Sequence, residues 1–457
     1  MGALVFGPTF AEMRDPSLVD PTVRAHALTA LTGDPLNPVN LFNITWKDAN
    51  NRVVHTVLPK ELTGVDAPIC VISGRHFPSG SHKVGASYSI LIEKQLDGSV
   101  RPEGAQIVLP STGNYGIGGA WVGPRMGYRS LVVLPEEMSA ERFERIESYG
   151  AEVIKTPGCE SNVKEIYDKV KELRTDPQNR ILNQFEEMGN YRFHYEVTGN
   201  SALELANHLA SQGVGNGQVA AFVSAMGSAG TIAAGDHLKE VEPACKIVGV
   251  EPVQCPTLYN VGFGGHRIEG IGDKHVTWIH NVLAMDLLVC IDDLDCLRGL
   301  QLLQQGTATL DESGIPRAAA EGFVDCFGVS SICNLLAAIK TVKVLGLGPN
   351  DLVVTVATDG FDRYPSVLAR LDEQEGHMDR DEALRRLEIF RRQDTSWTLE
   401  GTRDVRRRWH HQKYFTWVEQ QGKTVDELRA QEDPGFWHDQ RGKIAQIDAR
   451  QRELRGF

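Results

Sequence analysis

The sequence has few of the features that would place it in a membrane or on nucleic acid. Its 457 residues contain no uninterrupted apolar run of the ~18–20 residues that a membrane helix needs. The net charge is −13, from 47 basic and 60 acidic residues, whereas nonspecific binding to phosphate backbones needs clustered Lys and Arg. The first twenty residues lack the positive and apolar regions of a signal peptide. We therefore expect a cytoplasmic protein that binds neither membrane nor nucleic acid.

The cysteines do not form a metal-binding pattern. There are eight of them, and no two are spaced as C-x-x-C. Cys290 and Cys296 lie closest together, with no histidine at ligand spacing, so we expect no metal or haem site. Most of the cysteines lie in apolar runs, where cysteine acts as a small buried hydrophobe. We expect reduced thiols.

Strand-like and helical segments alternate through most of the chain, which predicts a mostly parallel α/β architecture. A single core stops growing near ~250–300 residues, so two or three units are expected. The expected strands are residues 53–58, 68–73, 106–109, 130–134, 152–156, 218–224, 246–251 and 351–357. The expected helices are residues 88–95, 138–149, 202–212, 329–343, 380–392 and 424–431.

Four segments follow predicted strands and carry polar chemistry. The first is Ser79-Gly80-Ser81-His82-Lys83-Val84-Gly85, the lysine loop (79–85). A lysine that forms a Schiff base must lose its proton, and partial burial beside a cation or a helix N-terminus lowers its pKa enough. Alone, this segment favours a surface lysine, because most lysines in Ser/Gly loops are surface lysines.

The second segment is Ser111-Thr112-Gly113-Asn114-Tyr115-Gly116, the carboxylate loop (111–116). Hydroxyls and backbone N–H groups at a strand-to-helix turn suit an anion such as an α-carboxylate. Asn114 could hydrogen-bond a ring oxygen. A βα turn that is merely capped by Ser or Thr would give the same pattern.

The third segment is Gly227-Ser228-Ala229-Gly230-Thr231, the phosphate loop (227–231), which opens a helix after a buried strand. Small residues expose N–H groups there, and the helix dipole favours a phosphate. The segment lacks the lysine of a P-loop and does not match G-x-G-x-x-G, so one monoester phosphate fits best.

The fourth segment is Thr358-Asp359-Gly360-Phe361-Asp362-Arg363-Tyr364, the ring loop (358–364). A polar side chain at the carboxyl end of a parallel strand points into the ligand crevice and could meet a ring nitrogen. A helix-capping Asp or Thr is the alternative. An amine, an anion loop, a phosphate loop and a ring-nitrogen partner together describe a pocket for pyridoxal 5'-phosphate.

The order of these segments resembles the fold-type II pyridoxal phosphate enzymes, specifically the cysteine synthase and cystathionine β-synthase family within the tryptophan synthase β-like superfamily. Further segments are similar to family motifs from about residue 70 to 371. They are Leu134-Pro135-Glu136-Glu137-Met138-Ser139, Tyr149-Gly150-Ala151-Glu152, Asn183-Gln184-Phe185-Glu186, His194-Tyr195-Glu196, Thr198-Gly199, Gly249-Val250-Glu251-Pro252, Ile268-Glu269-Gly270-Ile271-Gly272 and Gly328-Val329-Ser330-Ser331.

The resemblance implies two open, mostly parallel α/β sheets with the cofactor in the cleft between them. Residues 1–67 and 195–371 would form a large cofactor-binding domain. Residues 68–194 would form a smaller domain that carries the lysine and carboxylate loops. Residues 372–457 are rich in Arg, Asp, Glu, Gln and Trp and are expected to form a charged, mostly helical C-terminal extension. Its Arg406-Arg407-Arg408-Trp409 cluster is interpreted as a solvated or packed helix face.

The resemblance also implies roles for single residues. Lys83 would hold the cofactor as a Schiff base and act as the catalytic base. The other cofactor-binding residues would be His82, Asn114, Gly227, Ser228, Ala229, Gly230, Thr231, and Thr358 or Asp359. The substrate-binding residues would be Ser111, Thr112, Gly113, Tyr115 and Gln184. No metal ligand is expected.

Two residues depart from the family pattern. His82 precedes the lysine as in the tryptophan synthase β-subunit, where cysteine synthases usually have Ser-x-Lys-Asp-Arg. The serine that faces the pyridine nitrogen in the family falls on Asp359, with Thr358 beside it. An Asp there would favour ring protonation and a stronger electron sink. The sequence does not decide whether Thr358 or Asp359 faces the pyridine nitrogen.

The expected activity is β-elimination or β-replacement on a small β-substituted L-amino acid like O-acetylserine, serine or cysteine, through an aminoacrylate intermediate. A serine/threonine dehydratase-like ammonia-lyase that releases a 2-oxo acid is the alternative. A non-catalytic binding or regulatory homologue would have lost the lysine or the phosphate loop, and this chain has both. Family members are commonly homodimers, so a homodimer is expected.

Overall fold

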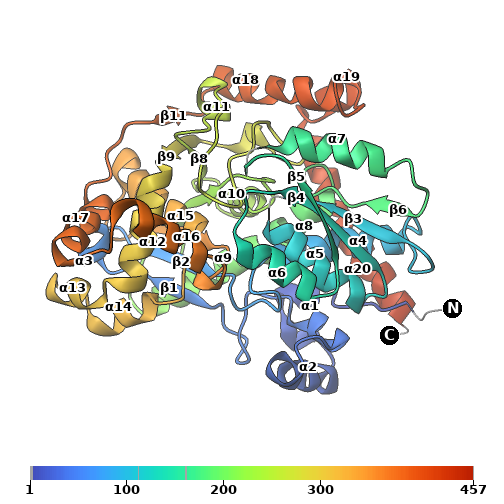
Figure 1. Ribbon diagram of the computed structural model, residues 1–457, viewed down its shortest axis with the longest axis horizontal. Coiled ribbons are helices and arrows are strands. Elements are labelled where there is room, and N and C mark those ends of the chain that lie inside the picture. Colours follow the sequence, from blue (N-terminus) through green and yellow to red (C-terminus); the bar gives the residue numbers. More distant parts are fainter. Residues whose placement is uncertain (1–3, 112, 160–161, 456–457) are drawn as a thin grey trace.

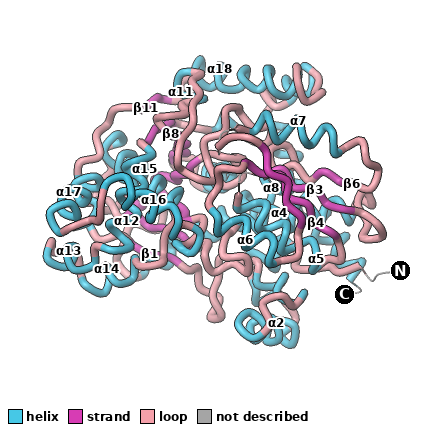
Figure 2. The backbone as a smooth tube through the Cα atoms, viewed as in Figure 1, coloured by secondary structure: helices cyan, strands magenta, loops and turns pink. Residues whose placement is uncertain are grey.

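Two twisted sheets form the centre of the computed structural model, which describes residues 4–111, 113–159 and 162–455. The large sheet has seven strands in the order β1-β2-β10-β7-β8-β9-β11, and the small sheet has four in the order β5-β4-β3-β6. The strands are drawn in magenta in Figure 2, with β3, β4 and β6 of the small sheet close together. The strands of the large sheet are β1 (His55–Val57), β2 (Ile69–Ser73), β7 (Val219–Ala225), β8 (Lys246–Pro252), β9 (Leu287–Ile291), β10 (Leu352–Ala357) and β11 (Thr398–Glu400). Those of the small sheet are β3 (Gln106–Pro110), β4 (Arg129–Pro135), β5 (Glu152–Thr156) and β6 (Asn179–Ile181).

The sheets are mostly parallel, as the alternation of strands and helices predicts. All pairings described in the small sheet are parallel. In the large sheet, the antiparallel pairings described are those of the edge strands β1 and β11. Strands β2 and β10 pair in parallel and are buried along their whole length, as expected when helices cover both faces of a sheet.

The helices carry most of the remaining chain (Figure 1). Those before residue 250 are α1 (Phe10–Arg14), α2 (Pro21–Gly33), α3 (Lys60–Thr63), α4 (Lys83–Leu96), α5 (Asn114–Arg125), α6 (Ala140–Ser148), α7 (Val163–Leu173), α8 (Met188–Phe193), α9 (Gly199–Ser211) and α10 (Ala233–Val241). Those after residue 250 are α11 (Thr257–Asn260), α12 (Asp293–Gln305), α13 (Thr307–Glu312), α14 (Arg317–Phe323), α15 (Val329–Leu345), α16 (Pro365–Glu375), α17 (Arg380–Arg391), α18 (Arg403–Lys413), α19 (Val425–Ala430) and α20 (Pro434–Arg455).

The two largest hydrophobic clusters each cover one region of the sheets. One packs α4 and α5 against the small sheet, against β2, β7 and β10 of the large sheet, and against the N-terminal segment around Phe10 and Trp46. The other lies between the large sheet and α12 and α15, where α15 has fourteen buried residues among its seventeen. A helix that is apolar on all sides is a buried helix, which explains why α15 packs directly beneath β10 and β7.

The sheets do not follow the domain boundaries expected from the sequence at every point. Strand β2 lies beyond the expected boundary at residue 68, yet it pairs with β10 of the large sheet. Strand β11 belongs to the expected extension, yet it pairs with β9 at the edge of the same sheet. Strand order is set by long-range pairing, which local sequence patterns do not reveal. The division into domains therefore remains a prediction.

The C-terminal helix α20 returns to the beginning of the chain (Figure 1). The Asp448 carboxylate accepts hydrogen bonds from the backbone N–H groups of Phe10 (2.8 Å) and Ala11 (3.0 Å). Gln451 Nε2 donates to Pro8 O (2.9 Å) and to the hydroxyl of Tyr88 on α4 (2.9 Å). The last helix thus fastens the N-terminal segment onto α4. Within the described residues, no helix is both long and apolar enough to span a membrane.

Candidate active site

Lys83 is the first residue of α4, which follows β2, and its side chain reaches the phosphate loop, which follows β7 of the same large sheet. The residue is 9% exposed, and its Nζ donates a hydrogen bond to Ser228 Oγ at 3.1 Å. The amide of Asn190, on α8, donates to the same hydroxyl at 3.0 Å. The helix was expected only from residue 88, but it begins at Lys83, so the lysine is fixed at a helix N-terminus. The lysine loop and the phosphate loop, 145 residues apart, therefore meet.

His82 places an imidazole behind the lysine. The ring is fully buried, its edge meets the ring of His194 at a centroid distance of 5.0 Å, and its Nε2 lies 3.4 Å from Thr358 Oγ1. Burial, and then the charge of Lys83, lower the pKa of His82 well below its ordinary value. A neutral imidazole in this place connects the lysine loop to the ring loop without adding a charge.

The phosphate loop joins β7 to α10 and has room only for small residues. A Cβ added to Gly227 would lie 2.5 Å from the carbonyl oxygen of Gly270, and one added to Gly230 would collide with Asn190 Oδ1. Ala229 has a φ of 60°, in the left-handed region that residues with a Cβ rarely adopt. The loop directly precedes α10, whose N-terminal dipole favours an anion. These features suit one phosphate group held by backbone N–H groups.

Asp359 is the centre of a buried network of polar side chains. It is completely buried, and its Oδ2 accepts hydrogen bonds from Asn114 Nδ2 (2.6 Å) and from the Tyr364 hydroxyl (2.9 Å). Two guanidinium groups lie close to the same oxygen, with Arg142 Nη2 at 3.8 Å and Arg363 Nε at 3.9 Å from Oδ2. The ring loop and the carboxylate loop therefore meet at Asp359, whereas Thr358 faces His82.

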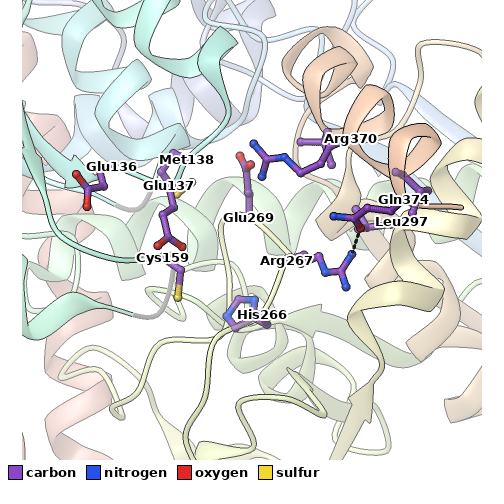
Figure 3. Close-up of a pocket in the computed structure, with 12 residues that line it drawn as sticks. Glu136, Glu137, Met138, Cys159, His266, Arg267, Glu269, Leu297, Arg370 and Gln374 are labelled. Carbon is purple, nitrogen blue, oxygen red and sulfur yellow. Dashed lines mark hydrogen bonds between the residues drawn. The ribbon is translucent and has the colours of Figure 1, made fainter.

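The same network extends to a surface groove. Arg142 is also paired with Glu269, whose carboxylate accepts from the Ser139 hydroxyl at 3.0 Å. Glu269 lines a groove of about 300 Å³ between the 136–138 segment and α16, where its carboxylate faces Arg370 in the close-up (Figure 3). No described residue of the four loops lines this groove, which reaches the site through Glu269.

The expected substrate-binding residues lie together in part. The Ser111 hydroxyl accepts the N–H groups of Gly113 (2.9 Å) and Gly116 (2.7 Å), so it holds the loop itself together. The hydroxyl of Tyr115 donates to Leu182 O at 2.9 Å, within the small sheet's core. Gln184 is buried beside the site, and its backbone oxygen accepts from Asn190 Nδ2 at 3.0 Å. Thr112 lies outside the described residues.

The polar atoms around Lys83 fit a bound cofactor. Among the buried atoms that have no hydrogen-bond partner in the described part of the chain are Asn114 Oδ1, Asn190 Oδ1, Asp359 Oδ1 and His82 Nδ1. Buried polar groups are nearly always hydrogen-bonded, and exceptions call for an explanation such as a ligand or ion. All four atoms belong to side chains that contact a loop of the site. A flat, polar ligand with a phosphate and an aldehyde for the amine of Lys83 is the kind of molecule that this arrangement suits.

Sequence reasoning missed three residues of this site. Asn190 connects Gln184 to Ser228, and the Thr277 hydroxyl donates to the Ser228 carbonyl at 2.9 Å. Asp273 is buried, and neither of its carboxylate oxygens has a hydrogen-bond partner among the described residues. Burial raises the pKa of Asp273 to about 7, while the charge of Lys83 lowers it. None of the three lies in a strand-to-helix turn, which was the signal that revealed the four loops.

Comparisons with known proteins agree with this geometry. Residues 73–359 match the family described as pyridoxal-phosphate dependent enzyme. The match spans more than half of the chain, and it includes the first three loops and the first two residues of the ring loop. The chain therefore belongs to the pyridoxal-phosphate-dependent enzymes, and its cofactor is pyridoxal 5'-phosphate.

Individual relatives narrow the class to fold type II and to the cysteine synthase and cystathionine β-synthase group. A probable cysteine synthase of Bacillus subtilis is 34% identical over 291 residues, which cover 63% of this chain and 85% of the relative. A cystathionine beta-synthase of Saccharomyces cerevisiae is 31% identical over 248 residues, or 52% of this chain and 47% of the relative. The resemblance noted from the sequence is confirmed.

Solved structures show the same fold. O-acetyl serine sulfhydrylase isoform 3 from Entamoeba histolytica has a TM-score of 0.59 and 26% identity, and the match covers 74% of this chain and 92% of that one. A hydrogen sulfide-producing enzyme from Fusobacterium nucleatum has a TM-score of 0.58 and 25% identity, with 76% and 95% covered. These chains are matched almost completely, so about a quarter of the present chain is additional to them.

Proposed function

We propose that this enzyme replaces the β-substituent of a small L-amino acid like O-acetylserine. The carrying observation is the contact between Lys83 Nζ and Ser228 Oγ, because it joins the reactive amine to the phosphate loop in a fold that its cysteine synthase relatives share. The bound cofactor supplies the electron sink that stabilises negative charge at the α-carbon.

The chain's own residues bind the substrate and move its protons. Lys83, once its amine is released, acts as the general base that removes the α-proton. Backbone N–H groups at the start of α5 bind the substrate carboxylate, since the positive end of this twelve-residue helix points there. Gln184 is joined to Ser228 of the phosphate loop through Asn190, whose amide donates to both. Burial of Lys83, His82 and Asp359 keeps bulk water away from the reacting carbon.

Asp359, rather than Thr358, is proposed to face the pyridine nitrogen. Its carboxylate contacts Asn114, the proposed partner of the ring oxygen, at 2.6 Å, whereas the Thr358 hydroxyl lies against His82. An acidic partner favours a protonated ring and a stronger electron sink. The D359N protein should therefore show a cofactor absorbance spectrum and pH dependence that differ from the wild type. The spectrum of T358V should stay unchanged if the assignment is right.

The reaction is tested with O-acetyl-L-serine in the presence and absence of sulfide. We expect cysteine with sulfide present, little pyruvate without it, and neither product from Lys83→Ala. Rapid pyruvate release that sulfide does not suppress would instead identify a dehydratase-like elimination. Absence of both products, with the cofactor bound, would refute the proposed substrate class.

Assembly and location are also proposed. We infer a homodimer from the family resemblance, and light scattering on the holoenzyme should give twice the mass of one chain. We infer a cytoplasmic location because all eight cysteines, which lie within the described residues, are thiols rather than disulfides, as suits a reducing compartment. Fractionation of the producing cells would check this location.

A further inference from the structure

The segment 273–281 separates the phosphate loop from the C-terminal extension. On its inner side, Thr277 donates to the Ser228 carbonyl at 2.9 Å. The backbone N–H groups of Trp278 (2.9 Å) and Ile279 (3.3 Å) both donate to Phe185 O. The segment therefore holds both the phosphate loop and the 183–190 segment beside it. Any shift of this segment moves the loop that carries the hydrogen-bond partner of Lys83.

On its outer side, the segment is held by the C-terminal extension. The indole N–H of Trp417 donates to Val276 O at 2.8 Å. Lys413 Nζ donates to Trp278 O (3.0 Å) and His280 O (2.6 Å). Three alternate carbonyls of the segment therefore face the extension, while the Thr277 side chain between them faces the phosphate loop.

Lys413 is the central residue of this contact. It is completely buried, and its third hydrogen bond goes to Gln431 Oε1 at 2.6 Å. Its hydrogen-bond acceptors in the described part of the chain are two carbonyls and one amide, and burial lowers the pKa of Lys413 well below its ordinary value. A buried amine is costly unless its donors are satisfied, so all three acceptors must stay in place around it.

A second contact reaches the helix that follows the phosphate loop. Asp236, on α10, is buried and accepts hydrogen bonds from the Tyr191 hydroxyl (2.8 Å) and from Asn281 Nδ2 (2.8 Å). Arg441 of α20 forms an ion pair with the same carboxylate, with its Nη2 3.4 Å from Asp236 Oδ2, and its Nε donates to the Tyr191 hydroxyl at 3.1 Å. The extension thus supports the phosphate loop from segment 273–281 and from α10.

We propose that residues 403–441 hold the phosphate loop in its cofactor-binding geometry through segment 273–281, with Lys413 as the positioning residue. The family match ends at residue 359, so this support is an addition outside the part of the chain shared with the family. The proposal concerns cofactor binding and holds whichever β-substituted amino acid the enzyme uses.

The test compares Lys413→Met with Lys423→Met. Methionine keeps much of the apolar stem of lysine but removes the three donors. Lys423 is a matched control because it lies in the same extension and its Nζ also lies over the Trp278 ring, at 5.5 Å, but it pairs with Glu186 and is 27% exposed. Hydrogen exchange is measured on the full-length apoprotein, and the dissociation constant of pyridoxal phosphate is measured by absorbance titration.

For K413M we expect faster exchange at residues 227–231 and 273–281, and cofactor affinity weakened about ten-fold, within the usual range of coupling between sites. K423M should match the wild type in both measurements. The proposal is overturned if K413M changes exchange only within 403–441 and binds the cofactor within two-fold of the wild type. Should K413M fail to fold, Trp417→Phe removes the bond to Val276 O, and the same two outcomes decide.

These measurements need no substrate turnover. An enzyme that makes no cysteine but shows the K413M effect would refute the proposed reaction and leave the positioning role intact. An enzyme that makes cysteine but does not show the K413M effect would refute the positioning role and leave the proposed reaction intact.

Discussion

Replacing Asp359 by asparagine removes one charge from the most buried polar network of the site. The shape of the side chain stays the same, so packing is preserved. The Oδ2 atom now accepts from Asn114 at 2.6 Å and from Tyr364 at 2.9 Å, and it lies within 4 Å of Arg142 and Arg363. An amide in the same place accepts these hydrogen bonds more weakly and no longer balances the two guanidinium groups.

The magnitude follows from which partners remain. Removing one partner of a buried ion pair costs about 3–5 kcal/mol when the other charge is left uncompensated. Arg142 keeps Glu269, and Arg363 keeps Asp362 at 3.0 Å, so neither cation is left alone. The loss is therefore smaller than that range, and we expect D359N to reduce the free energy of unfolding of the apoprotein by about 2 kcal/mol, the size of a hydrogen bond to a charged group.

The assay is urea unfolding of the apoprotein, followed by circular dichroism and tryptophan fluorescence. Asp362→Asn is the matched control, because it lies in the same loop and contacts the same Arg363, but its side chain is 45% exposed. The D362N substitution should lower the free energy of unfolding by less than about 1 kcal/mol. If D359N costs no more than D362N, the buried network does not stabilise the fold and the reasoning fails.

Three further predictions concern the cofactor, the phosphate loop and pH. In the wild type, borohydride reduction should attach the cofactor covalently to Lys83. Lys83→Ala should lack the absorbance band of the Schiff base, and after reduction mass spectrometry should find no cofactor adduct on it. An adduct on another residue would contradict the assignment of Lys83. Gly230→Ala should cost about 1–3 kcal/mol and weaken cofactor binding, because its Cβ would collide with Asn190 Oδ1; wild-type thermal stability and affinity would disprove this. Burial raises the pKa of Asp273 to about 7, so the folded apoprotein keeps a proton that the unfolded chain releases above about pH 4. Wild-type stability should therefore fall as pH rises from about 4 to 7, by at most about 4 kcal/mol, and Asp273→Asn should flatten this fall in urea titrations at a series of pH values; an unchanged slope would exclude the group.

The sequence predicted those parts of the site that local chemistry determines. The four loops are strand-to-helix turns with small residues, hydroxyls and one lysine, and this pattern is visible without a fold. The structure brings Lys83 to Ser228, and Asn114 to Asp359, as a single pocket requires. The Ser111 hydroxyl is used inside its own loop, which depends on detailed backbone geometry that local patterns do not reveal.

The remaining parts depend on contacts between distant segments. Asn190 and Thr277 act through single hydrogen bonds to the phosphate loop, and a lone Asn or Thr has no distinguishing pattern. Strand β9 and helix α20 were not expected, although both have clear structural roles. The Arg406–Trp409 cluster was interpreted as a solvated or packed helix face, and it has both characters. Trp409 is fully buried and its indole donates to Leu258 O at 2.9 Å, whereas Arg407 is exposed.

The bonds from α20 to the beginning of the chain affect how the protein is made. A ribosome releases residues in order, at roughly 5–20 per second, so Tyr88 and the N-terminal segment emerge long before Gln451 and Asp448. Until the last helix has left the exit tunnel, the N–H groups of Phe10 and Ala11 lack the carboxylate that accepts them in the finished fold. Nascent chains stalled shortly before α20 should therefore be cut by protease near residue 10, and chains in which α20 has emerged should resist this cleavage.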